Sequence, residues 1–270
     1  MTPELKAMTR RGLDLVRDPA ERAELRPVVN AIAQETYRRW LCGRTAEDNR
    51  VEHEFVVFGA AMRIAEAERL SFSGKLIVAC ATFLHDTFPI QRITEQAIRD
   101  AEARDRDLAI SLREAKERQR IAHMEGGARN ADLLLRELAH PDRPGESIVG
   151  ANVRDRCAAI IASHDYWKLG KPHPAGSDRE ALVCFEADAL WPLHPLGVLA
   201  DLERPGEDGE PRDVNDPEEW RRQVRNNLQT LREYRANWQG KDEVFQDAES
   251  IFRTAEGYRL YREWAGLWGL

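Results

Sequence analysis

The residues best suited to chemistry begin with an adjacent His-Asp pair, His85-Asp86, which ends an apolar run and precedes Pro89. Neighbouring side chains on a helix point about 100° apart, so the two can share one cation only where the helix ends and the second residue can turn. An imidazole nitrogen and a carboxylate oxygen together suit Fe, Mn, Zn or Mg. By itself, such a pair is also compatible with a helix-end histidine beside a solvated aspartate.

Other ionisable residues occupy similar positions in apolar helical patterns: His53, His123, His164 and Asp188. Such residues need a partner to be tolerated there, and each alone is compatible with a satisfied core or helix-end residue. Taken in order with the His-Asp pair, they form the series His, His-Asp, His, His, Asp. This series resembles the HD-domain superfamily of metal-dependent phosphohydrolases, and the resemblance covers roughly residues 45–195.

The resemblance implies a metal centre with the ligands His53, His85, Asp86, His123, His164 and Asp188. Two of the histidines, His123 and His164, exceed the mononuclear HD set and would hold a second ion if Asp86 bridges both. Two divalent ions per chain (Fe, Mn, Co or Mg), about 3.5–4 Å apart, would activate water and hold a phosphoryl group for in-line attack. The expected function is hydrolysis of a phosphate ester or nucleotide-like small molecule, with Asp86 also catalytic.

Two other functions remain open at this stage. The same ligand order also resembles the HD-type diiron oxygenases, which cleave C–C or C–P bonds with O₂. A regulatory or binding module with a degenerate site is the third hypothesis. Many HD proteins have glycine and lysine at the second and third positions after the His-Asp pair, where this chain has Phe88 and Pro89. Because that lysine contributes to substrate binding in the inositol-cleaving oxygenase, its absence counts against the oxygenase. It counts equally against any phosphohydrolase subfamily that uses the lysine, unless arginines or the lysines at 168–171 replace it.

Basic residues near the ligands are the candidates for binding a small anionic substrate. Arg92 follows the His-Asp pair, and Lys168 and Lys171 lie in an irregular, aromatic-rich loop after His164. That composition suits a phosphate pocket, although a surface turn has the same composition. Asp165 is a candidate catalytic residue that would orient its neighbouring ligand or assist proton transfer; the alternative is a helix-end residue facing water.

The elements that must position these residues are predicted to be helices, because apolar residues recur at helical spacing through most of the 270 residues. We expect an all-α, irregular helical bundle of the HD type with extra helices at both ends. Residues 1–44 would form an N-terminal helical extension and residues 45–200 the metal-binding core. Residues 201–270 would form a loop and helices whose aromatic residues pack on the core or make a homodimer contact.

The segment before the third histidine has a different character. A charge-rich helix is expected over roughly residues 94–120, and a separate helix is expected to begin at His123. Gly126 and Gly127 in the first turn of that helix cost about 1 kcal/mol each in helix propensity. This cost favours a close approach of backbone to a metal or substrate; the alternative is a kinked or late helix start.

Composition limits the partners and the compartment. The formal charge is −7 and no basic tract occurs, so a nucleic-acid partner is not expected. No stretch approaches 18 apolar residues and no apolar leader is evident, so we expect neither a membrane span nor a signal peptide. The four cysteines have no CxxC spacing, and Cys80 and Cys157 lie in apolar runs. Buried free thiols and a cytoplasmic location are therefore expected.

Overall fold

The computed structural model describes residues 1–42, 50–89, 93, 95–171, 173–204, 212–237, 245–247 and 250–269. Within these ranges the chain is all-α, as predicted, with one small antiparallel hairpin. The elements are α1 (Pro3–Asp14), α2 (Pro19–Leu41), α3 (Glu52–Ala67), α4 (Phe72–Leu84), α5 (Glu95–Glu102), α6 (Arg106–Glu137), β1 (Ala139–His140), β2 (Arg143–Ser147), α7 (Ala151–Ile161), α8 (Arg179–Leu190), α9 (Pro195–Glu203), α10 (Pro217–Asn237) and α11 (Ala255–Gly266). Short 3₁₀ turns lie at Tyr166–Leu169, Pro174–Gly176 and Trp191–Leu193.

Polar residues placed just before the helices explain where several of them begin. In each case a side-chain oxygen accepts a hydrogen bond from a backbone N–H in the first turn, which satisfies a donor that the helix itself cannot. The residues that act in this way are Thr2, Asp18, Ser71, Asp105, Asp178 and Thr254. Local sequence therefore sets the starts of α1, α2, α4, α6, α8 and α11.

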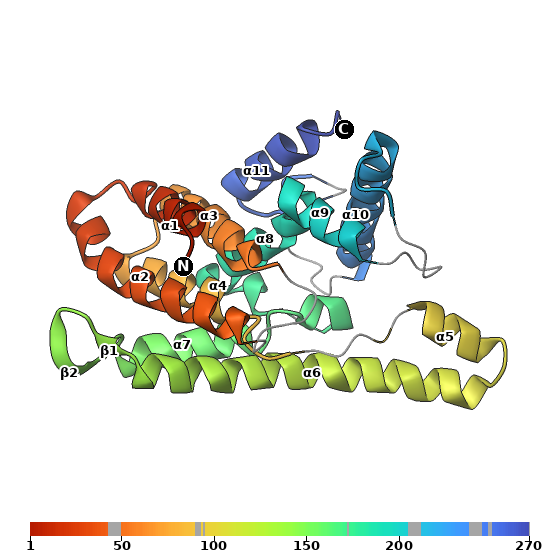
Figure 1. Ribbon diagram of the computed structural model, residues 1–270, viewed down its shortest axis with the longest axis horizontal. Coiled ribbons are helices and arrows are strands. Elements are labelled where there is room, and N and C mark those ends of the chain that lie inside the picture. The colour runs from red at the N-terminus through yellow and green to blue at the C-terminus, as the bar shows by residue number, and fades with distance from the viewer. Residues whose placement is uncertain are drawn as a thin grey trace.

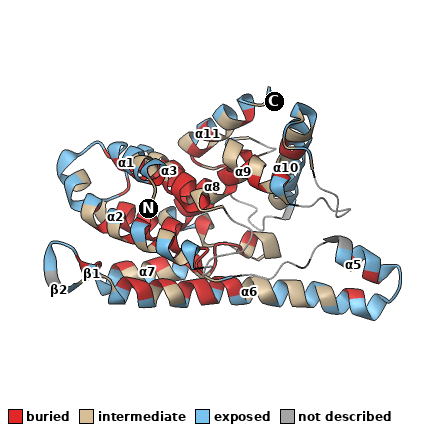
Figure 2. Ribbon diagram, in the orientation of Figure 1, coloured by how far each residue is buried: buried red, intermediate tan, exposed pale blue. Residues whose placement is uncertain are grey.

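Helices α3 and α4 form the centre of the molecule (Figure 2), where most of their residues are buried. α4 packs against α2, α3, α7 and α8. A helix covered on all sides must be apolar all round, and every residue of α4 from Gly74 to Leu84 is buried. Cys80, Cys157 and Cys184 are free and buried in this region. The expectation of buried thiols at the first two is confirmed.

The long helix α6 runs along one edge of the molecule, and α5 folds back against its N-terminal part (Figure 1). The predicted boundaries are wrong here. The chain breaks near residue 104, where Asp105 caps α6, and α6 then continues through His123 to Glu137 without interruption. Gly126 and Gly127 therefore lie inside the helix. Packing of α6 along α7 outweighs their low helix propensity, which is a weak preference.

The C-terminal helices α9, α10 and α11 lie on the opposite side of the core from α6 (Figure 1). Glu186 in α8 anchors the segment before α11: its Oε1 accepts hydrogen bonds from the backbone N–H of Arg253 (2.5 Å) and of Thr254 (2.9 Å). Aromatic residues of α10 and α11 are partly buried against the core: Trp220, Tyr234, Tyr258, Tyr261 and Trp264. A homodimer contact stays a prediction.

Within the described ranges, no single helix is both long and apolar enough to cross a membrane. One bent pair, Arg179–Leu193 with Pro195–Glu203, meets the length and composition test only when its two parts are taken together.

Candidate metal centre

The fold brings all six predicted ligands to one place in the core. His53 is the second residue of α3, and His85 and Asp86 immediately follow α4. His123 lies in the middle of α6, and His164 follows α7. The sixth, Asp188, lies near the end of α8 and is the only one of the set that is partly rather than fully buried. Helices far apart in the sequence therefore converge on a single polar cluster.

His53 and His85 form the first half of the cluster. Their Nε2 atoms lie 3.0 Å apart, and Asp188 Oδ1 lies 3.5 Å from each of them. Asp86 Oδ2 is 3.5 Å from His53 Nε2. Two nitrogens bound to one metal at about 2.1 Å and at right angles would be about 3 Å apart. The spacing of these atoms therefore suits a single cation.

The second half of the cluster uses the other oxygen of Asp86. Its Oδ1 lies 3.1 Å from His123 Nε2 and 3.8 Å from His164 Nε2. The ligand atoms of Asp86, His123 and His164 form one compact group, and those of His53, His85 and Asp86 form another. Asp86 belongs to both, so its carboxylate links the two groups.

Backbone carbonyls orient three of the four imidazole rings. Because a carbonyl oxygen can only accept, the Nδ1 that contacts it must carry the proton, which leaves the Nε2 lone pair for a metal. The three contacts are His85 Nδ1 to Thr82 O (3.0 Å), His123 Nδ1 to Phe88 O (2.5 Å) and His164 Nδ1 to Ile161 O (2.7 Å). All three rings thus present a donor atom to the centre.

His53 differs from the other three histidines. Its Nδ1 is buried and has no hydrogen-bond partner in the described part of the chain, and its ring and that of Trp191 meet edge to face, with 5.0 Å between the centroids. Burial lowers the pKa of His53 to about 4, outweighing the opposing effect of Asp86. His53 is therefore neutral near pH 7, the form in which an imidazole binds a metal.

The carboxylates give the cluster a strongly negative electrostatic potential. Despite burial, contact with His85 and His123 holds the pKa of Asp86 well below its usual range, and the pKa of Asp188 falls to about 2. Burial alone would lower the pKa of His85, but Asp86 and Asp188 outweigh it and raise that pKa to about 10. A field that holds a proton this tightly also favours a divalent cation. The donor set therefore fits a metal centre.

The two glycines of α6 allow this helix to approach the end of α4. A Cβ at Gly127 would lie 2.9 Å from the backbone carbonyl oxygen of His85 and 3.2 Å from Ile161 Cγ2. A Cβ at Gly126 would overlap the ring of Phe88. A close approach therefore occurs at these glycines, where helix α6 meets the end of α4 that carries His85 and Asp86. This contact brings His123 within reach of Asp86.

Beside His164, the carboxylate of Asp165 is held by two cations. Lys168 Nζ lies 2.6 Å from Oδ1, and Arg120 forms an ion pair with Oδ2. Although burial alone would raise it, these cations and His164 hold the pKa of Asp165 far below its usual range. Lys171 instead pairs with Glu117 on α6, at 3.5 Å. Arg92, the other predicted substrate-binding residue, lies outside the described residues.

Sequence reasoning missed Arg120 and Glu54. Arg120 lies three residues before His123, on the same face of α6, a spacing that could have drawn attention to it. Glu54 follows His53 directly and is buried. Burial, together with Asp86, raises the pKa of Glu54 to about 8. The sequence could have indicated Glu54, because it is a glutamate in an apolar run next to a predicted ligand.

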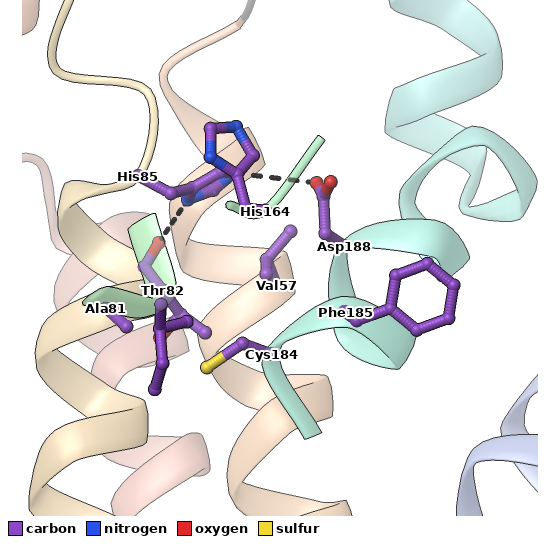
Figure 3. A pocket seen from close by; sticks show the side chains of 9 residues that line it. Val57, Ala81, Thr82, His85, His164, Cys184, Phe185 and Asp188 are labelled. Atoms are coloured by element: carbon purple, nitrogen blue, oxygen red, sulfur yellow. Dashed lines mark hydrogen bonds and ion pairs between the residues drawn. The ribbon is translucent and has the colours of Figure 1, made fainter. Parts of the chain in front are cut away.

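A small cavity of about 10 Å³ lies beneath the cluster, with room for about one water molecule. In Figure 3, the side chains of His85, His164 and Asp188 point toward one another on one side of the cavity. Its floor is mostly apolar, formed by side chains that include Val57 and Phe185. Water therefore has little access to the ligands from the core side.

No protein-family model matches the chain, and no curated protein or solved structure matches it either. The site is therefore defined by geometry: an all-α chain carries a buried His/Asp cluster, His53, His85, Asp86, His123 and His164, able to bind metal ions.

Proposed function

We propose that this chain is a metal-dependent phosphohydrolase of the HD type that uses two divalent ions to hydrolyse a phosphate ester or a nucleotide-like small molecule. The observation that carries the proposal is the position of Asp86, whose two carboxylate oxygens face separate histidine pairs. The order of the ligands along the chain, His, His-Asp, His, His, Asp, supports the same family.

When bound, two divalent ions would lower the pKa of a coordinated water and neutralise charge on the phosphoryl group. The chain's own residues supply the geometry. Asp86 links the two sides of the site, and the backbone carbonyls hold the imidazole rings in place. In the overall reaction, an oxygen of water forms a new bond to phosphorus, the ester P–O bond breaks, and a proton from water ends on the leaving alcohol. Positioning and charge neutralisation supply most of the catalysis.

The donor atoms also bear on the identity of the metal. Four imidazole nitrogens and two carboxylates form a borderline set, which favours Mn, Fe or Co over the oxygen-preferring Mg. The identity of the bound metal therefore has to be measured together with the number of ions per chain.

The proposal is tested by counting metals in freshly purified protein and by assaying phosphate release from a panel of phosphate esters with Mn, Co or Mg. We expect about two ions per chain, as the two ligand groups imply, and metal-dependent phosphate release. A His140→Ala variant is the matched control, because His140 is a buried histidine outside the cluster whose Nδ1 accepts a hydrogen bond from the backbone N–H of Asp142. It should retain both metals.

Absence of bound metal would contradict the proposal and favour a binding module. Two irons with a mixed-valence EPR signal, O₂ consumption and no phosphate release would contradict it in favour of the diiron oxygenase.

A further inference from the structure

The Arg120–Asp165–Lys168 cluster carries more positive than negative charge. Each cation pairs with Asp165, so one carboxylate faces two cations. The Asp165 side chain is only 4% exposed, whereas those of Arg120 and Lys168 are 23% and 25% exposed. The anion is thus the most buried member of the cluster, and about a quarter of each cation's side chain remains exposed.

The cluster lies directly beside the second half of the metal centre. Asp165 Oδ2, the atom that pairs with Arg120, lies 3.9 Å from His164 Nε2. Arg120 also lies one turn before His123 on α6, and the backbone N–H of Asp165 contacts Met124 Sδ in the same helix at 3.3 Å. The two cations are therefore separated from a predicted metal ligand by a single carboxylate group.

Surrounding residues hold the cluster in place. Trp167, which lies between Asp165 and Lys168 in the chain, is buried, and its ring meets Tyr234 of α10 edge to face at 4.0 Å between centroids. The C-terminal part of the chain therefore supports the 3₁₀ turn that carries Lys168. Cations held in fixed positions lose little conformational entropy when an anion binds between them.

We propose that Arg120 and Lys168 form the subsite for the non-reacting oxygens of a phosphate monoester dianion, and that Asp165 positions these two cations. This inference rests on the proposed function and names the substrate class of the same site. A guanidinium presents a planar fork to phosphate oxygens, and an ammonium adds a point charge. A phosphodiester carries one negative charge fewer and has a second ester group in place of a charged oxygen, so it fits this subsite less well.

The test measures binding of inorganic phosphate to Mn-loaded protein by titration calorimetry, with the metal content of each sample determined in parallel. Arg120→Met and Lys168→Met should each weaken phosphate binding by about 10-fold to 100-fold, the loss of one charge-assisted hydrogen bond. Both should keep the wild-type number of metals. Arg118→Met is the matched control on α6: Arg118 is exposed and pairs with Glu114, so phosphate affinity should not change.

Two further measurements are needed: one uses a milder variant in case Arg120→Met folds poorly, and the other compares classes of substrate. Arg120→Lys keeps the charge beside Asp165 but loses the planar fork, so it should weaken phosphate binding several-fold, less than Arg120→Met. The wild-type protein should prefer phosphate monoesters to diesters in kcat/KM, and the two Met variants should lose most of that preference.

The outcomes separate this inference from the proposed function. Wild-type phosphate affinity in Met variants that retain their metals overturns the subsite and leaves the metal-dependent hydrolase in place. Loss of metal together with phosphate affinity also overturns it, because the cluster would then support His164 rather than substrate. A wild-type protein that binds no metal contradicts the proposed function itself.

Discussion

Replacing Gly127 with alanine should act on the metal centre through helix packing alone, since glycine supplies no ligand. An alanine Cβ would lie 2.9 Å from the carbonyl oxygen of His85 and 3.2 Å from Ile161 Cγ2. The carbonyl belongs to the backbone of a predicted ligand, so it cannot move aside without moving that ligand. We expect α6 to shift away from the end of α4 and to carry His123 away from Asp86, which lies 3.1 Å from it.

The magnitude follows from two opposing effects. Gly→Ala inside a helix gains about 1 kcal/mol in propensity, whereas overpacking of this kind costs about 1–3 kcal/mol. The free energy of unfolding of the metal-free protein should therefore change little or fall by up to about 2 kcal/mol. Metal coordination tolerates errors of only about 0.2 Å, so binding of the second ion should weaken by roughly 10-fold to 100-fold, as for changes in groups that orient ligands.

The matched control is Gly59→Ala in α3, where an added Cβ would meet nothing within 4 Å. The free energy of unfolding of this variant should rise by about 1 kcal/mol, the full gain in helix propensity. Its metal affinity should equal that of the wild type. The assay combines thermal unfolding of the metal-free proteins with metal titration of all three. If Gly127→Ala were stabilised as much as Gly59→Ala and bound both ions with wild-type affinity, the inferred role of this helix contact would be wrong.

Three further predictions concern the ligands and a buried carboxylate. His85→Ala or Asp86→Ala should abolish metal binding and activity while the helical circular dichroism spectrum stays largely intact; full metal content in either variant would exclude the pair as ligands. His123→Ala should lower the metal content from about two ions to about one, whereas a purely structural histidine would lower the melting temperature with metal content unchanged. Burial raises the pKa of Glu186 from 4.5 to about 7, so the folded state binds the proton more tightly than the unfolded state. The free energy of unfolding should then fall by up to ~3 kcal/mol as pH rises from about 4.5 to about 7; a Glu186→Gln variant with the same pH profile would refute this.

The sequence by itself determined the helical class and the chemical types at the site. Apolar spacing predicts helices because it reflects which face of each helix is buried, and caps such as Ser71 and Asp178 act within a few residues of themselves. The six predicted ligands could also be named in advance, because their order along the chain resembles that of the HD-domain superfamily; an apolar helical run by itself shows only that an ionisable residue within it needs a partner. Helical spacing, caps and the order of residue types can all be read from a single sequence.

Only the tertiary structure decided how these residues meet. The continuity of α6 through Gly126 and Gly127 depends on packing against α7, which outweighs local propensity. The placing of each Asp86 oxygen opposite a different histidine pair, and the sharing of Asp165 by Arg120 and Lys168, depend on distances between side chains on separate helices. Periodicity within one helix carries no information about such distances, because they are set by how the helices cross and pack together.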